Sequence, residues 1–279
     1  MKKILVILFS LSLVSCAVEG LESTIVNNAN NPNNPNNPNN TATFTEALPL
    51  NNGNYWTYDV VGLTNTRDSL YIFGDETIGA HTYKKFKNRN NIATGFYCTS
   101  VNNNNVRKEA GKLLLTGNLS VLQGITLPAG VDFSVTDFVI FKENATNGEI
   151  LSEKTGTFQQ TISNFPVTIE YRLRAIGGDN YASFTSPNND VYPNVKSTKI
   201  VVSLKITTTQ TIAGFPITLN ILPQQDVVVS TQYLSKNIGI VYTKTNTNFT
   251  LDATIAAQIG LPVSNSQEQE EFLDTYNIN

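Results

Sequence analysis

The chain has 279 residues, of which 40% are hydrophobic and 15% are charged, and its formal charge at pH 7 is −3. This length and apolar content are sufficient for one large domain with a buried core. A chain with net negative charge lacks the basic field that holds nucleic acid, so nucleic acid is excluded as a partner.

The first 15 residues have the pattern of a secretory signal. Two lysines precede an apolar run, residues 4–14, which is too short to span a bilayer as a stable helix. The run ends in the letters LVSC, residues 13–16, and this ending resembles the lipobox of bacterial lipoproteins. The resemblance implies cleavage before Cys16, a diacylglycerol thioether on its sulfur, and a fatty acyl chain such as palmitate on its amino group. Several acyl chains would make a permanent membrane anchor; the alternative is a secreted protein with a chance cysteine.

Residues 16–41 have the composition of a tether. From Asn27 the sequence reads NNANNPNNPNNPNN, with proline at every third position of the repeat. Proline removes backbone donors, asparagine favours turns, and the segment has too little apolar surface to offset the entropy of ordering it. As a coil, about 25 residues span about 25–30 Å. We therefore expect a disordered tether that holds a single domain, residues 42–279, clear of the lipid headgroups.

From Tyr55 onward the hydrophobic pattern has period two, which is typical of half-buried antiparallel strands. In VTIEYRLRAI, for example, Leu173 falls on the apolar face and Arg172 on the polar face. Residues 264–277, SNSQEQEEFLDTYN, begin with a serine that favours a helix cap, and a closing strand is the alternative. Further strands are expected at 53–60, 68–74, 81–87, 94–101, 112–117, 137–143, 197–207 and 226–234.

The predicted fold is therefore all-β. It consists of one antiparallel curved sheet, an open barrel or a sandwich, with a short C-terminal helix or closing strand. Two segments fifty residues apart, QTISNFPVTIEY from Gln160 and QTIAGFPITLNI from Gln210, each predict a hairpin with a two-residue turn. Asn164 and Gly214 occupy the turn position that needs positive φ. Either a duplication or convergent hairpin chemistry explains the similarity.

Three stretches, GNYWTYDV, GDETIGAHTYKKF and YLSKNIGIVYTKT, resemble a layout found in outer-membrane lipoproteins of Bacteroidota-type bacteria that have no assigned activity. The resemblance covers most of the mature chain and carries no catalytic residues. It implies an all-β domain, such as an open barrel of the lipid-carrier type, anchored at the outer membrane. The periplasmic and surface sides of that membrane both remain open.

Candidate catalytic and metal-binding residues are sparse. His81 is the only histidine, no G-x-S-x-G motif accompanies it, and we expect it on a solvent-facing turn or strand. Cys98, the only cysteine besides Cys16, is expected as a buried strand residue rather than a nucleophile. One histidine and one free cysteine leave no conventional zinc site, so no metal and no cofactor are predicted.

The carboxylates do not form a recognisable motif either. Asp75 and Glu76 would point to opposite faces of a strand. The loop residues 188–190, Asn-Asn-Asp, lack the order of a calcium-binding loop. The acidic residues at 268, 270 and 271 are expected to form a solvated face.

Exposed aromatic rings bind sugars, and Trp56 and Tyr58 share one face of a predicted strand. They are weak candidates for a ligand platform, and packing in the core is the alternative.

Two functional hypotheses follow. The first is a lipid-anchored, non-catalytic binding or structural module for an apolar ligand, a glycan or a partner protein. The second is an envelope hydrolase whose carboxylates come from several strands. An enclosed apolar cavity would favour the first, and two converging desolvated carboxylates would favour the second.

Overall fold

The computed structural model describes residues 44–119, 133–162, 165–212, 215–259 and 262–279. The signal, the tether, Cys16 and the two turn residues Asn164 and Gly214 lie outside the described residues. The strands are β1 (Tyr55–Val61), β2 (Thr66–Ile78), β3 (His81–Asn88), β4 (Asn105–Glu109), β5 (Lys112–Asn118), β6 (Ser134–Lys142), β7 (Ile150–Ile162), β8 (Phe165–Thr185), β9 (Val191–Ile212), β10 (Phe215–Ser235), β11 (Gly239–Thr250) and β12 (Ser264–Asn277). The helices are η1 (Arg89–Asn91), α1 (Phe96–Val101) and α2 (Ala253–Ile259).

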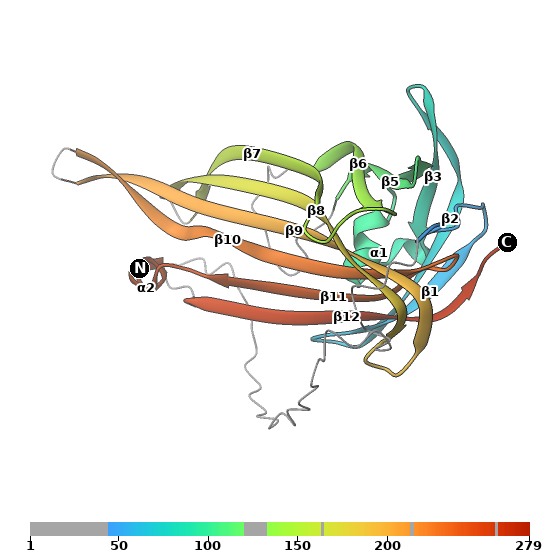
Figure 1. Ribbon diagram of the computed structural model, residues 1–279. Helices are drawn as coiled ribbons and strands as arrows, with labels where there is room; N and C mark the ends of the chain where they lie inside the picture. Colours follow the sequence, from blue (N-terminus) through green and yellow to red (C-terminus); the bar gives the residue numbers. More distant parts are fainter. Residues whose placement is uncertain (1–43, 120–132, 163–164, 213–214, 260–261) are drawn as a thin grey trace.

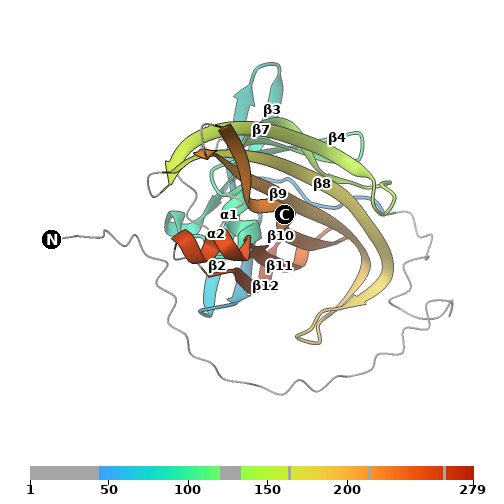
Figure 2. The ribbon, with the colours of Figure 1, turned by 90° about the vertical axis from the view of Figure 1, so that its left-hand side faces the viewer.

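All strands join one antiparallel sheet that curls into a nearly closed barrel (Figures 1 and 2). Its order is β6-β5-β4-β3-β2-β1-β12-β11-β10-β9-β8-β7. This confirms the predicted all-β class. The C-terminal segment is the strand β12, which pairs with β1 on one side and β11 on the other. The helix favoured for this segment is wrong, because its period-two pattern buries Glu271 and Leu273 in the barrel.

The two edge strands of the sheet, β6 and β7, lie at opposite ends of its hydrogen-bonded order. Side chains bridge them: Val139 N donates to Ser152 Oγ at 2.9 Å, and Lys154 Nζ donates to Ser134 O at 2.5 Å. These bonds satisfy edge groups that would otherwise be open for pairing with another chain.

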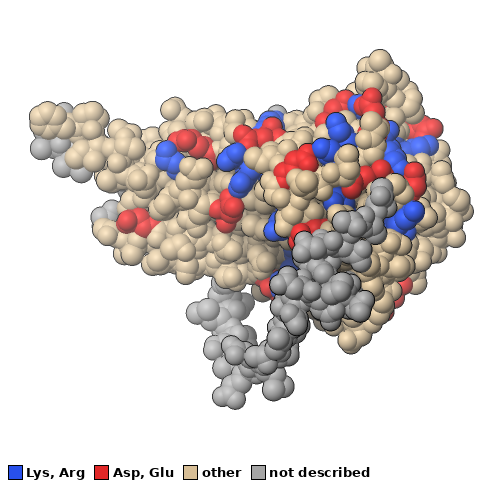
Figure 3. Space-filling view, in the orientation of Figure 1, with Lys and Arg blue, Asp and Glu red and all other residues tan. Residues whose placement is uncertain are grey.

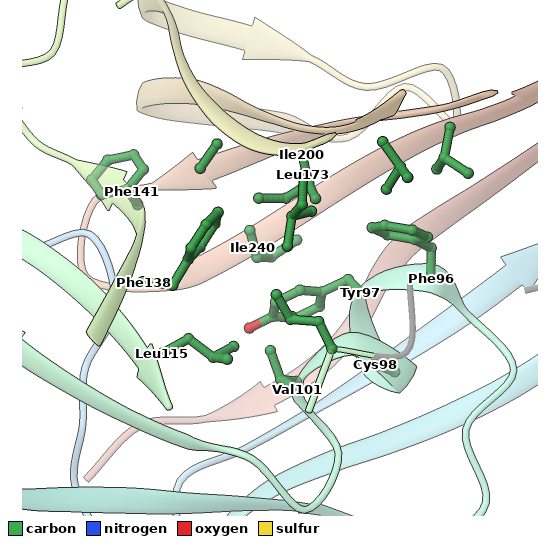
Figure 4. Packing of buried hydrophobic residues seen from close by; sticks show 14 of the residues in the cluster. Phe96, Tyr97, Cys98, Val101, Leu115, Phe138, Phe141, Leu173, Ile200 and Ile240 are labelled. Atoms are coloured by element: carbon green, nitrogen blue, oxygen red, sulfur yellow. The ribbon is translucent and has the colours of Figure 1, made fainter. Parts of the chain in front are cut away.

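Side chains fill the barrel interior. Leu173 is fully buried, whereas Arg172 lies outside and pairs with Glu153, which confirms the predicted register of β8. In Figure 4, Phe138 from the wall lies in one cluster with Tyr97 and Val101 of the short helix α1, which lies inside the barrel. Most buried apolar side chains of the described residues therefore pack into one core cluster.

The helix α1 replaces a strand predicted for residues 94–101. Five of its six residues are buried, including Cys98. A segment surrounded by apolar side chains has no neighbouring strand to pair with, and a helix satisfies its backbone groups internally. The burial of Cys98 is confirmed, although its secondary structure is not. Among the described residues, no helix is long and apolar enough to cross a membrane.

Candidate functional site

The N-terminus of α1 points at the inner faces of β2 and β12. Each of these strands presents a buried carboxylate there, Asp68 and Glu271, both 1% exposed. Asp68 lies on the same face of β2 as Leu70, and Glu271 lies on the same face of β12 as Leu273. Strand alternation therefore places both acids in the core, where a carboxylate is stable only if its oxygens are hydrogen-bonded.

The first four N–H groups of the helix region have no partner within the helix, because an α-helix always leaves such groups free. Wall side chains accept all four. The bonds are Gly95 N to Asp68 Oδ2 (2.7 Å), Phe96 N to Gln269 Oε1 (2.8 Å), Tyr97 N to Glu271 Oε1 (2.7 Å) and Cys98 N to Glu271 Oε2 (3.4 Å). The cap also explains why the acids are buried: they complete the hydrogen bonding of an internal helix.

The loop before α1 is held by the same acid. Thr94 donates its N–H to both oxygens of Asp68, at 3.0 and 2.9 Å, and its hydroxyl to Oδ1 at 2.9 Å. Thr66 Oγ1 lies 2.5 Å from Thr94 Oγ1 and therefore donates to it. Gln269 Nε2 donates to Thr94 O at 3.0 Å.

Burial raises the pKa of Glu271 to about 7, and the nearby Asp68 carboxylate acts in the same direction. The N–H groups of Tyr97 and Cys98 act in the opposite direction but do not offset the loss of solvation. Burial also raises the pKa of the Cys98 thiol well above its ordinary value. The thiol is therefore protonated near neutral pH and is not an activated nucleophile.

Cys98 Sγ and one oxygen of each carboxylate lie within 4.8 Å of one another, a spacing that metal ligands show. However, the carboxylate oxygens already accept hydrogen bonds from the loop and helix backbone. The cluster is accounted for as a helix cap.

A pocket of about 200 Å³ lies beside this cap, where β11 and β12 continue past the connection between β1 and β2. Five of its lining residues are threonines and two are glutamines, and Phe96 and Leu63 supply apolar surface. It contains a single carboxylate, Glu268, which pairs with Lys244 at 2.9 Å. The lining consists of Leu63, Thr64, Thr66, Thr94, Phe96, Thr245, Thr247, Gln267, Glu268 and Gln269.

The aromatic residues singled out from the sequence belong to the core. Trp56 and Tyr58 are both 1% exposed, and each donates a hydrogen bond to the backbone of the β10–β11 region, to Ile238 O at 2.6 Å and Ile240 O at 2.9 Å. In the folded chain these rings offer no surface platform. A second aromatic cluster lies on the opposite face of the sheet, where Phe184 and Tyr233 stack with ring centroids 4.3 Å apart.

Other predicted positions are dispersed. His81 is exposed at the start of β3, as expected. Asp75 and Glu76 pair separately with Lys84 and Lys85 on the neighbouring strand. Asp190 accepts a hydrogen bond from Asn188 at 2.8 Å within the β8–β9 turn.

Of the three C-terminal acids expected on a solvated face, Glu271 is buried, so that expectation is wrong for it. Asp68 was not recognised from the sequence. A signal for both exists, since each stands two residues before a leucine on one strand face.

Comparisons with known proteins add little about function. No protein-family model matches the sequence, and no curated protein matches it. Among solved structures, a chain from Parabacteroides distasonis described as a candidate lipoprotein is similar, with 10% identity and a TM-score of 0.38. The match covers 85% of the present chain and 100% of the other.

Proposed function

We propose that this chain is a lipid-anchored protein of the bacterial cell envelope whose barrel is a non-catalytic binding module for a small glycan. The observation that supports binding is the pocket lining, in which threonine hydroxyls and glutamine amides surround one aromatic ring. The sequence features that support anchoring are the lysine-led apolar run and the LVSC ending at Cys16.

The pocket chemistry favours a neutral, hydroxyl-rich ligand. Threonine and glutamine side chains both donate and accept hydrogen bonds, as sugar hydroxyls require. The single acid in the lining already has a lysine partner, so the pocket offers no unpaired charge for an ionic ligand. Drug-sized ligands occupy pockets of about 300–1,000 Å³, and 200 Å³ is therefore the size for one sugar ring rather than a chain.

Filling this pocket should weaken binding at least tenfold. Thr247 on β11 lines the pocket but takes no part in the helix cap, so Thr247→Leu should occlude the pocket and leave the fold intact. We expect saturation-transfer NMR with a panel of neutral mono- and disaccharides to detect binding by the wild type and at least a tenfold weaker affinity for the variant. Thr209→Leu, at an exposed threonine on β9, is the matched control and should bind as the wild type does.

If no saccharide in the panel binds, or if Thr247→Leu binds as tightly as the control, the glycan proposal is wrong. Binding of an anionic saccharide alone would also contradict it, because the lining lacks a free cation.

The alternative, a carboxylate-based hydrolase, has one observation in its favour. Asp68 and Glu271 converge, and Thr66 and Thr94 link Asp68 to the pocket by two successive hydrogen bonds. Against this, both acids are buried and hydrogen-bonded to the backbone before α1 and within it. Release of reducing ends from the bound saccharide, lost in Asp68→Asn while binding persists, would establish the hydrolase instead.

The anchor has its own test. Cys16→Ser should leave the precursor unlipidated, so that cells supplied with labelled palmitate incorporate the label into the wild type but not into the variant. Cys98→Ala removes the other thiol and should leave the labelling unchanged. A Cys16→Ser protein that still takes up the label would contradict lipid anchoring at Cys16.

A further inference from the structure

The two similar segments noted in the sequence form neighbouring hairpins. Register pairs Ile162 with Phe165 at the β7–β8 end and Ile212 with Phe215 at the β9–β10 end. Because β8 and β9 are adjacent in the sheet, both ends lie at the same end of the barrel (Figure 1). Val167 of β8 pairs with Thr208 of β9, and this is the last pair of the two strands at this end of the barrel. Between this pair and the turns, β8 has two more residues and β9 has four, so the β9–β10 hairpin projects further.

The β9–β10 end exposes large apolar side chains. Phe215 is 72% exposed and Ile217 is 40% exposed, and Pro216 between them is exposed as well. Further along the same strand, Leu222 is buried in the core. The apolar residues of β10 thus extend past the end of the packed interior, where nothing in the described chain covers them.

The outer parts of the two hairpins at this end of the molecule are also free of charged residues. Residues 206–225 contain no lysine, arginine, aspartate or glutamate, and neither do residues 155–169 of the neighbouring hairpin. Charged residues make up 15% of the chain, so two such stretches at one end are a local feature. Figure 3 shows acidic and basic side chains over the body of the barrel, whereas the projecting β9–β10 hairpin shows neither kind.

We propose that the β9–β10 tip, with Phe215, Pro216 and Ile217, docks into the boundary between headgroups and acyl chains of a lipid bilayer. An uncharged tip enters this boundary without desolvating ions, and water among the headgroups can still bond the backbone groups on the outer edges of the hairpin. Aromatic and aliphatic side chains on a projecting element are the groups that bind this boundary.

The length of chain before the barrel permits this contact on the bilayer that holds the proposed anchor, and in this respect the inference rests on the proposed function. Phe44 packs on Phe141, and Asn237 N donates to Glu46 O, so the tether joins the barrel beside the β10–β11 turn, opposite the tip. The 28 positions from Cys16 to Phe44 reach at most about 95 Å. The 22 residues of β9 span about 70 Å, so the tether can pass along the whole barrel.

The test uses the unlipidated Cys16→Ser chain, so that the tip is measured without the anchor. We expect this protein to co-float with phosphatidylcholine vesicles and to remain bound in 1 M NaCl, because no charge takes part. Phe215→Ser combined with Ile217→Ser should lower the bound fraction at least tenfold. Phe73→Ser is the matched control, since Phe73 is 60% exposed on β2, away from the tip.

A second readout is independent of flotation. In Phe215→Trp the new indole should shift its emission to shorter wavelength when vesicles are added, against a constant background from the buried Trp56. Failure to float, equal flotation of the double serine variant, or no emission shift would overturn the proposal. Self-association in solution that is lost in the double variant, without vesicle binding, would assign the tip to a second copy of the chain instead. The palmitate-labelling experiment reports only on lipidation at Cys16, so its outcome is separate from the outcome of this test.

Discussion

Gly95→Ala is expected to destabilise the protein by about 2–4 kcal/mol, through overpacking and a disrupted charged cap. A Cβ at this position would lie 2.1 Å from Glu271 Oε2 and 2.4 Å from its Cδ. Glu271 cannot move away cheaply, because it is buried and accepts the N–H groups of Tyr97 and Cys98. Gly95 has a φ of −73°, so the cost comes from space and not from backbone strain. Denaturant midpoints of the Cys16→Ser chain with and without the substitution measure it.

Gly74→Ala is the matched control, since a Cβ there meets no atom within 4 Å, and it should change stability by less than about 1 kcal/mol. A double-mutant cycle then identifies the cause. With Glu271 replaced by alanine the clash is gone, so the additional cost of Gly95→Ala should fall well below its value in the wild-type background. Additive costs would show that Gly95 is required for a reason other than the space taken by Glu271.

Most of the sheet could be predicted from the sequence, because its strands alternate between a wet face and a buried face. Leu173 and Arg172 fall where the period of two places them. The prediction fails at Phe96–Val101, whose aromatic and β-branched residues are as suitable for a strand as for this helix. What decides its structure is its place inside the barrel, where wall side chains provide the cap. That environment is a property of the tertiary fold.

The candidate site was predictable only in part. Acidic residues are usually solvated, and this rule leads to the wrong environment for Glu271. A strand assignment for residues 264–277 would have placed Glu271 beside Leu273 on the inner face. Asp68 follows in the same way from Leu70 on β2. That both acids meet one helix N-terminus does not follow from either strand alone, because 203 residues separate them in the chain.

The pH dependence of stability should report Glu271 directly. Its pKa is about 7 in the folded protein, against an ordinary value of 4.5. Below about pH 4.5 the group is protonated in both the folded and the unfolded chain and costs nothing. Between pH 4.5 and 7 the unfolded chain releases the proton while the folded chain keeps it, so stability falls as the pH rises, by about 3 kcal/mol in total. Above pH 7 the group is ionised in both states and the loss is complete.

Glu271→Gln removes this titration while keeping the shape of the side chain and one acceptor for the helix cap. Measured by urea unfolding from pH 4.5 to 7.5, the stability of the variant should therefore rise relative to the wild type by about 3 kcal/mol across the interval.

The groups around Glu271 are Asp68 from β2, Tyr58 from β1, and Tyr97 and Cys98 from α1. Burial raises the pKa values of both tyrosines and the thiol, so these three do not titrate in this range. Glu268→Gln, on the exposed side of the same strand, should run parallel to the wild type, because a surface ion pair contributes little. If Glu271→Gln also runs parallel, Glu271 is ionised in the folded protein throughout, and the helix cap stabilises its charge more than burial opposes it.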